Sequence, residues 1–353
     1  MEDILKHFKT KKIVLIGNGF DRNHKLPTSY VDFLNWWIKK KVDEFNSPSI
    51  SFDEWDDNNI NVGDSLRSNP NLLRRITENP VCQNITSIFP SNYFIIKNTL
   101  LFNLINRTYL DGWVNIESFY FKELVFCIKN GSRQFPSPYS IPYLADGIKS
   151  ARQLNEELEL IKDELKEYIK VVQENAPRTK RLSGFMKKYG KGDLIVNFNY
   201  TNTIERYYNR ENRPEIVNIH GTVSDEITFG YGNENDEDYK MIERMEDNSL
   251  LDHIKSFNYA LNGNYKTIDF YIKDPGHVGN YHVDIIGLSC GLSDGVLLND
   301  IFNNEKCTGV TIYYHESERK FKDTYQNISR HFDNPSRLRS IVNTFDEKYK
   351  LPS

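Results

Sequence analysis

The sequence predicts an α/β fold: a Rossmann-like, mostly parallel sheet flanked by helices, with a large helical insertion. The first observation is the apolar run Ile13–Ile16, which is typical of a strand covered on both faces. The second is Gly17-Asn18-Gly19, which follows at once and gives the strand-then-glycine turn that opens nucleotide-binding α/β domains. The third is the second half of the chain, where apolar strands again alternate with helical segments.

Composition narrows the class of protein. The chain has 353 residues, a net charge of −4 and four cysteines that form no C-x-x-C pair. Such a charge gives no general attraction to nucleic acid, and the cysteine spacing suggests reduced thiols rather than a zinc site, so we expect no metal. No apolar run approaches the length of a membrane helix and no targeting segment is evident, so we expect a cytoplasmic protein without membrane contact.

The first half of the chain is predicted to be mainly helical. Tyr30–Val42 has helical spacing, with Thr28 or Ser29 as its cap. A dehydrogenase-type fold would next give a strand ending in an acid, but residues 47–70 are rich in Ser, Asn and Asp, so the chain departs from that pattern. The clearest helix lies at residues 146–173, where leucine and isoleucine recur every three or four positions.

These patterns predict how the chain is divided. Residues 1–50 and 181–353 should form a nucleotide-binding core, and residues 51–180 a helical insertion that acts as a lid or an interaction region. Within this insertion a helix should begin near Trp113 and run toward Cys127. Glu117 near its start is either a site residue or a carboxylate that stabilises the helix terminus.

The second half is predicted to contain a set of strands interleaved with helices. The expected strands are Leu194–Val196, Ile216–Ile219, Ile227–Gly232, Val283–Leu288 and Val310–Tyr314. Compact polar signatures follow four strands of the chain: Gly17-Asn18-Gly19, Asn197-Phe198-Asn199, His220-Gly221 and Ser289 through Asp294. In a parallel sheet ligands bind outside the carboxyl ends of the strands, so we expect these signatures to face one crevice.

The amino-terminal stretch resembles the signature of the AbiH family, bacterial abortive-infection proteins. The matching elements are Gly17-Asn18-Gly19-Phe20-Asp21, Leu26-Pro27-Thr28-Ser29-Tyr30 and Asp32-Phe33. AbiH-like sequences also show F-N-Y-T, H-G and G-x-S elements further on, as this chain does. The resemblance implies a role in defence against bacteriophage.

The chain is more distantly similar to the sirtuin-type NAD-binding fold. By order and strand context, Asn199-Tyr200-Thr201 resembles the sirtuin asparagine element, His220-Gly221 the general-base element and Gly287-Leu288-Ser289 the adenosine-side element. Thr201 replaces the usual acid, the arginine after the proline segment is missing, and no zinc-binding cysteine pairs are present. The resemblance therefore implies NAD cleavage rather than protein deacylation.

Candidate site residues follow from these two resemblances and from the strand-end pattern. Asn199 and His220 are the expected catalytic residues, with Asn199 holding a ribose hydroxyl or water and His220 as general base. Asp21 or Asp294 would hold a ribose hydroxyl or stabilise positive charge on the sugar. The expected NAD-binding residues are Gly17, Asn18, Gly19, Phe20, Asp21, Pro27, Thr28, Ser29, Tyr30, Asn197, Tyr200, Ser289 and Asp294.

Simpler interpretations stand beside these roles. The glycines suit a tight turn without a ligand, His220 a hydrogen-bonding residue at a strand end, and Asp294 the cap of a helix that begins near Gly295. His24 lies near the glycine turn but outside the matched positions.

The function predicted from sequence is an effector that hydrolyses NAD to nicotinamide and ADP-ribose, with a homo-oligomer or another defence protein as partner. The alternative is a non-catalytic sensor or regulatory subunit that binds NAD or ADP-ribose. A toxin acting on nucleic acid is the least favoured reading, because the sequence has no basic stripe.

Overall fold

The structure is a computed structural model. It describes residues 10–45, 60–62, 94–111, 115–130, 150–178, 181–208, 211–273, 279–315 and 317–352. The chain divides into two compact units, which we describe separately. The first unit comprises Met1–Pro27, Ile169–Lys240 and Ile254–Ser353, and the second comprises Thr28–Tyr168 and Met241–His253.

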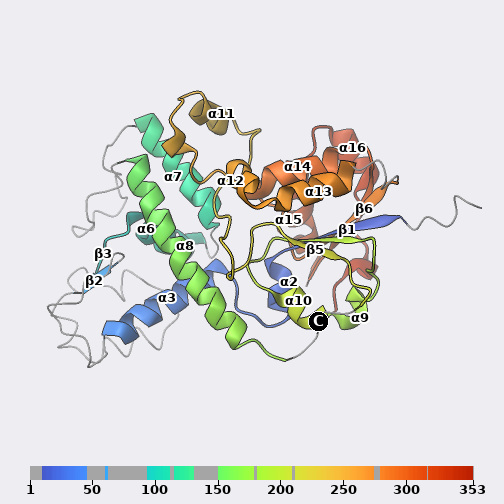
Figure 1. The fold of residues 1–353 in the computed structure, drawn as a ribbon, viewed down its shortest axis with the longest axis horizontal. Coiled ribbons are helices and arrows are strands. Elements are labelled where there is room, and N and C mark those ends of the chain that lie inside the picture. Colours follow the sequence, from blue (N-terminus) through green and yellow to red (C-terminus); the bar gives the residue numbers. More distant parts are fainter. Residues whose placement is uncertain are drawn as a thin grey trace, which may run out of the picture. The chain divides into compact units, whose positions relative to one another are not determined.

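A parallel five-stranded sheet forms the centre of the first unit (Figure 1). Its strands are β1 (Lys11–Ile16), β4 (Leu194–Asn197), β5 (Glu215–Asn218), β6 (Tyr281–Ile286) and β7 (Cys307–Tyr313). Their spatial order is β5-β4-β1-β6-β7, and every neighbouring pair is parallel. After β1 the chain adds β4 and β5 on one side of it and then β6 and β7 on the other side. The strand order therefore reverses beside β1, which is a topological switch point.

Alternating residues of β1 show why both faces of this sheet are covered. Ile13 and Leu15 belong to one apolar cluster, whereas Val14 and Ile16 belong to a second. The first cluster contains residues of α12 (Lys255–Asn262), α13 (Asn264–Lys273), α14 (Gly295–Asn303), α15 (Glu318–Ser329) and α16 (Pro335–Ile341). The second contains residues of α2 (Asn18–Asn23), α9 (Ser183–Met186) and α10 (Thr203–Tyr208). A strand with helices on both faces must be apolar throughout, which explains the unbroken run in the sequence.

The second unit is described mainly by its helices. They include α3 (Tyr30–Phe45), α6 (Thr99–Asp111), α7 (Ile116–Asn130) and most of α8 (Ala151–Glu174), with an antiparallel pair β2 (Ile60–Val62) and β3 (Phe94–Ile96). Lys40 and Lys41 of α3 both form ion pairs with Glu164 of α8, at 2.8 and 3.0 Å. The sides of these two helices meet through Phe33, Trp36 and Tyr168.

Most predicted elements agree with the observed ones within a few residues. One strand was predicted wrongly: Ile227–Gly232 forms no strand, and Tyr231 makes only an isolated bridge with Ile254. The reason lies in its glycine content, since a Cβ on Gly232 would lie 2.9 Å from the Ser293 carbonyl oxygen. This segment is a loop that packs closely against its neighbours.

The predicted division into core and insertion remains a prediction. Much of the predicted insertion, including residues 63–93 and 131–149, lies outside the described residues, as do Cys82 and Trp113. Among the described cysteines, Cys127, Cys290 and Cys307 are free thiols. In the part of the chain that the structure describes, no helix is both long enough and apolar enough to cross a membrane.

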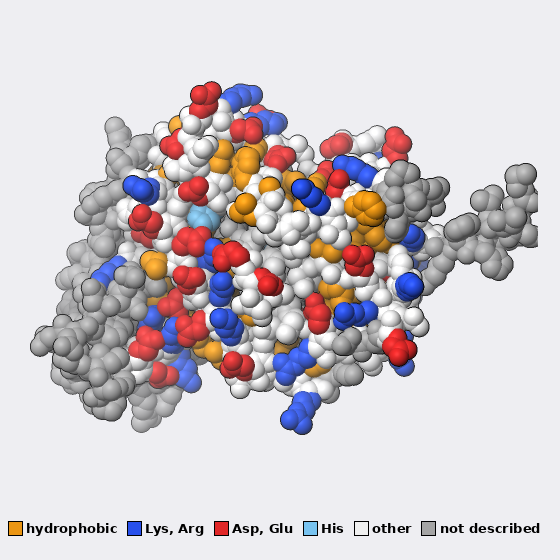
Figure 2. All heavy atoms as spheres, in the orientation of Figure 1, with side chains coloured by type: hydrophobic (Ala, Val, Ile, Leu, Met, Phe, Trp, Pro, Cys, Tyr) orange, Lys and Arg blue, Asp and Glu red, His pale blue; other side chains and the backbone are white. Residues whose placement is uncertain are grey.

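Charged side chains of both signs are interspersed on the face of the molecule drawn in Figure 2. This mixture fits the near-neutral composition of the chain, with 45 basic and 49 acidic residues. A protein that binds nucleic acid through its surface would instead gather Lys and Arg in a patch or stripe.

Candidate functional site

The carboxyl ends of neighbouring strands bring the predicted polar signatures together in the first unit. The loop after β4 hydrogen-bonds to β1, since the Phe198 N–H donates to the Ile16 carbonyl at 2.9 Å. The loop after β5 is joined to β4 in the same way, through Ile219 and Asn197 at 3.0 Å. These bonds place the loops after β4 and β5 beside the ends of the neighbouring strands, and the crevice that the signatures are predicted to face remains a prediction.

The glycine turn after β1 is packed tightly against the turn after β6. The Gly17 N–H donates to the Ile286 carbonyl at 3.1 Å and the Gly19 N–H to the Gly287 carbonyl at 2.8 Å. A Cβ on Gly19 would lie 2.7 Å from the Gly287 Cα, and Gly287 itself has a φ of 64°. Close packing between these two turns is therefore one physical reason for Gly19 and Gly287.

The two asparagines after β4 hold the loops in place. The Asn197 side-chain amide donates to the Asn218 side chain at 2.8 Å and to the Thr201 carbonyl at 3.2 Å. Its oxygen accepts from the Asn199 backbone N–H at 3.1 Å. The Asn199 side-chain amide donates to the Gly17 carbonyl at 3.1 Å, which joins the β4 loop to the glycine turn.

Asp21 is a fully buried carboxylate in α2. Its Oδ2 accepts a hydrogen bond from the Thr201 hydroxyl at 2.7 Å, and the Thr203 hydroxyl donates in turn to Thr201 at 3.0 Å. Its Oδ1 has no hydrogen-bond partner in the described part of the chain. Burial raises the pKa of Asp21 to about 6, although the hydroxyl hydrogen bonds oppose this shift.

Thr201 has a physical reason to replace an acid in this environment. A second carboxylate at this position would repel Asp21 in a buried setting, whereas the threonine hydroxyl donates a hydrogen bond to it. Thr201, which departs from the sirtuin pattern, thus has a hydrogen-bond partner in Asp21, 180 positions away in the sequence.

His220, Asp294 and Lys255 form a second buried polar group. The same Asp294 oxygen lies 2.7 Å from the Lys255 Nζ and 3.1 Å from the His220 Nε2. The other ring nitrogen of His220 lies 3.2 Å from the Phe198 carbonyl oxygen. The Nε2 also lies 3.5 Å from the Tyr259 hydroxyl, so both ring nitrogens have polar neighbours.

Lys255 was not predicted from the sequence. It is completely buried at the start of α12, and its side chain passes Gly232, where a Cβ would lie 3.2 Å from the Lys255 Cβ. No sequence motif marks this residue. Lysines are usually exposed to solvent, so nothing in the sequence indicated a buried one here. Its partner Asp294 lies 39 positions further along the chain.

Asp294 is the N-cap residue of α14, as the simpler interpretation predicted, but its side chain makes no capping hydrogen bond. Burial alone would raise its pKa, but Lys255 and His220 outweigh burial and lower the pKa well below its usual range. Asp294 is therefore ionised, whereas Asp21 has no cationic partner among its hydrogen bonds.

Several other predicted residues have structural roles. Phe20 is part of the apolar cluster on the α9 side of the sheet. His24 is buried between the Phe20 carbonyl oxygen at 2.8 Å and the Tyr208 hydroxyl at 2.6 Å, and burial lowers its pKa. Tyr200 is half-buried with its ring near His220, and Ser289 is exposed.

The residues at the end of the amino-terminal signature fall into different units. Pro27 ends the first segment of the first unit, and Thr28, Ser29 and Tyr30 belong to the second unit. The Ser29 hydroxyl accepts a hydrogen bond from the Asp32 N–H at 3.1 Å, which confirms Ser29 as a cap of α3.

Among the described residues, no group of three His, Cys, Asp or Glu side chains could hold a metal ion. The chemistry available at the strand ends is that of a carboxylate with one open oxygen, an ionised acid, a histidine, a buried lysine and side-chain amides. These groups can bind hydroxyls and exchange protons.

The comparison with family models now identifies the family. The model described as Bacteriophage abortive infection AbiH matches residues 13–315. The chain belongs to the AbiH family. The AbiH match runs from β1 through β7 and so includes all the strand ends described above. Comparisons with curated proteins and with solved structures gave no match, so the similarity to sirtuins remains a hypothesis from sequence.

Proposed function

We propose that this AbiH protein is an anti-phage effector that binds NAD at the carboxyl ends of β1, β4, β5 and β6 and hydrolyses it to nicotinamide and ADP-ribose. The AbiH family carries the abortive-infection role. The strand order β5-β4-β1-β6-β7 supports a nucleotide ligand, because Rossmann-like sheets share this order and bind dinucleotides at the switch point beside the first strand.

The observation that carries this proposal is Asp21. A fully buried carboxylate with one oxygen lacking a hydrogen-bond partner is costly for a protein to maintain, which makes such a group a candidate for function. With a pKa of about 6, Asp21 is mostly ionised at neutral pH and its open oxygen can accept from a ribose hydroxyl.

The same group suits the chemistry of NAD cleavage. Breaking the nicotinamide–ribose bond leaves positive charge on the sugar, which a nearby carboxylate stabilises. Water then forms the new bond to the ribose carbon, nicotinamide leaves as a neutral molecule, and one proton is released. Asn199 would orient the ribose or the water and His220 would take the proton, which requires each to exchange one of its present hydrogen bonds for the ligand.

The present bonding of His220 favours a second candidate function. Both ring nitrogens already have protein neighbours, the Phe198 carbonyl oxygen at 3.2 Å and the Asp294 carboxylate at 3.1 Å. In a non-catalytic sensor, His220 would keep these bonds, and NAD or ADP-ribose binding would signal to a partner through the positions of the loops.

The test is nicotinamide release from NAD by the purified full chain, with binding measured by calorimetry in the same samples. For a hydrolase we expect release that falls at least about a hundredfold in His220→Ala and Asn199→Ala, in line with the loss of a general base or a positioning group. His282→Gln is the matched control, because His282 lies within β6 rather than at its carboxyl end.

Three outcomes are distinguishable. Release by the wild type that is lost in both variants supports the hydrolase. Saturable NAD binding without release supports the sensor and contradicts hydrolysis. Absence of binding by the folded chain rules out both functions that depend on NAD.

A further inference from the structure

The candidate site at the strand ends contains a lysine that solvent does not reach. Lys255 is completely buried at the start of α12, and its Nζ lies 2.7 Å from the Asp294 Oδ1. The same carboxylate oxygen lies 3.1 Å from the His220 Nε2. One oxygen of Asp294 therefore lies between an ammonium group and the histidine proposed as general base.

The loop before α11 holds the Lys255 side chain in this position. The Lys255 N–H donates to the Tyr231 carbonyl at 2.8 Å, and a Cβ on Gly232 would lie 3.2 Å from the Lys255 Cβ. The Val296 N–H of α14 donates in turn to the Gly232 carbonyl at 2.8 Å. This loop thus connects the start of α12 with the start of α14, where Asp294 is the N-cap residue.

The helix α12 also supplies a tyrosine to the surroundings of His220. Tyr259 lies one helical turn after Lys255, its hydroxyl is 3.5 Å from the His220 Nε2, and its ring is parallel to the imidazole. The ring of Tyr200 lies 5.9 Å from that of His220. Because tyrosine hydroxyls are ordinarily neutral near neutral pH, the charges that face His220 from these elements belong to Asp294 and Lys255.

Two further titratable groups lie near Asp294. Burial raises the pKa of the Cys290 thiol and lowers the pKa of His331, so both are neutral near neutral pH. The His331 Nε2 lies 2.9 Å from the Cys290 carbonyl oxygen. Neither group offsets the negative charge of Asp294, whereas Lys255 does.

Lysine and histidine hold their protons with different strength. Their ordinary pKa values are about 10.4 and about 6.5, so near neutral pH a lysine bound to an acid stays charged while a histidine can exchange its proton. A buried aspartate that faced a histidine alone would favour the imidazolium form, which cannot take up a proton. Because Lys255 offsets the charge of Asp294, this carboxylate attracts the His220 proton less strongly.

We propose that Lys255 is a positioning residue of the NAD site, which binds Asp294 and so keeps the His220 ring able to take up and release a proton. The inference rests on the proposed role of His220 in NAD cleavage. Lys255 acts through Asp294 and does not touch the ligand. When His220 exchanges its contact with Asp294 for the ligand, Lys255 remains as the partner of that buried carboxylate.

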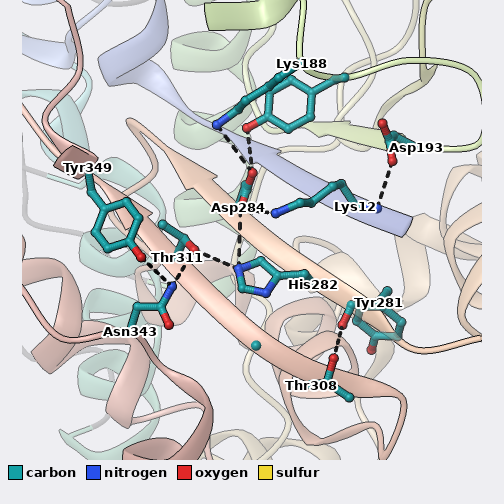
Figure 3. Close-up of polar contacts among 12 residues, drawn as sticks. Lys12, Lys188, Asp193, Tyr281, His282, Asp284, Thr308, Thr311, Asn343 and Tyr349 are labelled. Carbon is teal, nitrogen blue, oxygen red and sulfur yellow. Dashed lines mark hydrogen bonds and ion pairs between the residues drawn. The ribbon is translucent and has the colours of Figure 1, made fainter. Parts of the chain in front are cut away.

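A similar group of residues lies within the sheet, before the carboxyl end of its strand (Figure 3). Asp284 of β6 is fully buried, and its Oδ1 lies 3.2 Å from the Lys12 Nζ and 3.6 Å from the His282 Nε2. Its Oδ2 lies 3.6 Å from the Lys188 Nζ. Lys12→Met is the matched control for Lys255→Met, because it removes a lysine from a buried aspartate that is not at the strand ends.

The first measurement examines the His220 ring in the absence of NAD. Nitrogen NMR of the full chain with isotope-labelled histidine reports how far each ring nitrogen is protonated, and His220→Ala identifies the signals. Near neutral pH, Lys255→Met should increase protonation of the ring, because Asp294 then faces His220 without a lysine partner. Asp294→Asn should decrease it, and Lys12→Met should leave the His220 signals unchanged.

Circular dichroism verifies that each variant is folded. If Lys255→Met does not fold, Lys255→Gln replaces it, because glutamine is also uncharged but keeps a hydrogen-bond donor for Asp294. A His220 ring that is protonated to the same extent in the wild type and in the folded Lys255 variant would overturn the proposal. An equal change in Lys12→Met would also overturn it, since the effect would then not depend on Asp294.

Nicotinamide release by the same proteins measures the consequence for the proposed reaction. In Lys255→Met, kcat should fall at least about tenfold near neutral pH with little change in KM, and activity should recover at a pH roughly one to two units higher, where the ring loses its proton. A loss that is equal at every pH would show a purely structural role and overturn the proposal. Absence of release by the wild type would contradict the proposed function, and the NMR measurement then decides the role of Lys255 by itself.

Discussion

Asp21 and Asp294 are both buried acids at the carboxyl edge of one sheet, yet their surroundings push them in opposite directions. Asp21 accepts a hydrogen bond from a threonine hydroxyl, its other oxygen has no hydrogen-bond partner among the described residues, and burial raises its pKa to about 6. Asp294 meets the same cost of burial but accepts from Lys255 and His220, which lower its pKa well below the usual range.

The difference teaches which acid can respond to a ligand. A carboxylate held by two cations already has its partners and mainly fixes their positions, whereas one with an open oxygen gains from a hydroxyl that enters the site. Asp284 is intermediate: it is equally buried, but its two lysine partners are partly exposed. The lysine that pairs with Asp294 is fully buried, whereas the two lysines that pair with Asp284 remain partly exposed to solvent.

The largest expected effect on stability comes from removing the buried lysine that pairs with Asp294, since Asp294 then lacks a lysine partner, as Asp21 does. Lys255→Met removes the lysine and leaves the carboxylate with His220 alone, so we expect a loss of about 3–5 kcal/mol in the free energy of unfolding. Chemical denaturation monitored by circular dichroism measures it. Adding Asp294→Leu to the variant should recover part of the loss, because a buried charge is then no longer left behind.

A surface lysine provides the comparison for that result. Lys273 pairs with Asp269 on the exposed side of α13, at 2.5 Å, with 69% of its side chain accessible. We expect little measurable change in Lys273→Met, because solvent screens such a pair. Equal losses in the two variants would contradict the distinction drawn for Lys255.

The second effect concerns the pH dependence that Asp21 contributes. Its folded pKa of about 6 exceeds the ordinary value of 3.8, so the folded state binds more protons between these values. The stability that the neutral acid provides is therefore lost as the pH rises through this window. Relative to the wild type, Asp21→Asn should gain up to about 3 kcal/mol between about pH 4 and about pH 7.5.

Denaturation curves of both proteins across this range give the measurement. The difference between them should level off above about pH 7, where Asp21 is ionised in both folded and unfolded chains. A difference that stays constant with pH would show that Asp21 is not held in the protonated form by burial. Loss of nucleotide binding in the same variant would sharpen its assignment to the site.

The smallest effect concerns the hydroxyl that supports Asp21. Thr201→Val removes the hydroxyl that donates to the Asp21 Oδ2, so we expect a loss of about 1 kcal/mol in the free energy of unfolding at neutral pH and a further rise in the pKa of Asp21. The pH window of the preceding experiment should then extend upward. Thr201→Ser keeps the hydroxyl and should restore the wild-type window, and failure to do so would assign the effect to packing.

Much of the fold could be predicted because its signals are local. The apolar run before Gly17 predicts a strand with both faces covered, and helical spacing predicts α3 and α8. The strand predicted at Ile227–Gly232 was wrong because Gly232 packs closely against Ser293 and Lys255, which the local pattern does not reveal. The convergence of the strand-end signatures could be predicted because parallel strands share one carboxyl edge.

The sequence by itself determined the family, the parallel sheet and the edge at which Asp21, Asn199, His220 and Asp294 meet. Only the tertiary structure decided what each of them does there. It placed Lys255 beside Asp294, gave Asp21 a threonine rather than a cation, and used the glycines to pack two turns together. The physical reason is that a strand follows from neighbouring residues, whereas the charge and bonding of a buried group depend on partners that folding brings from distant parts of the chain.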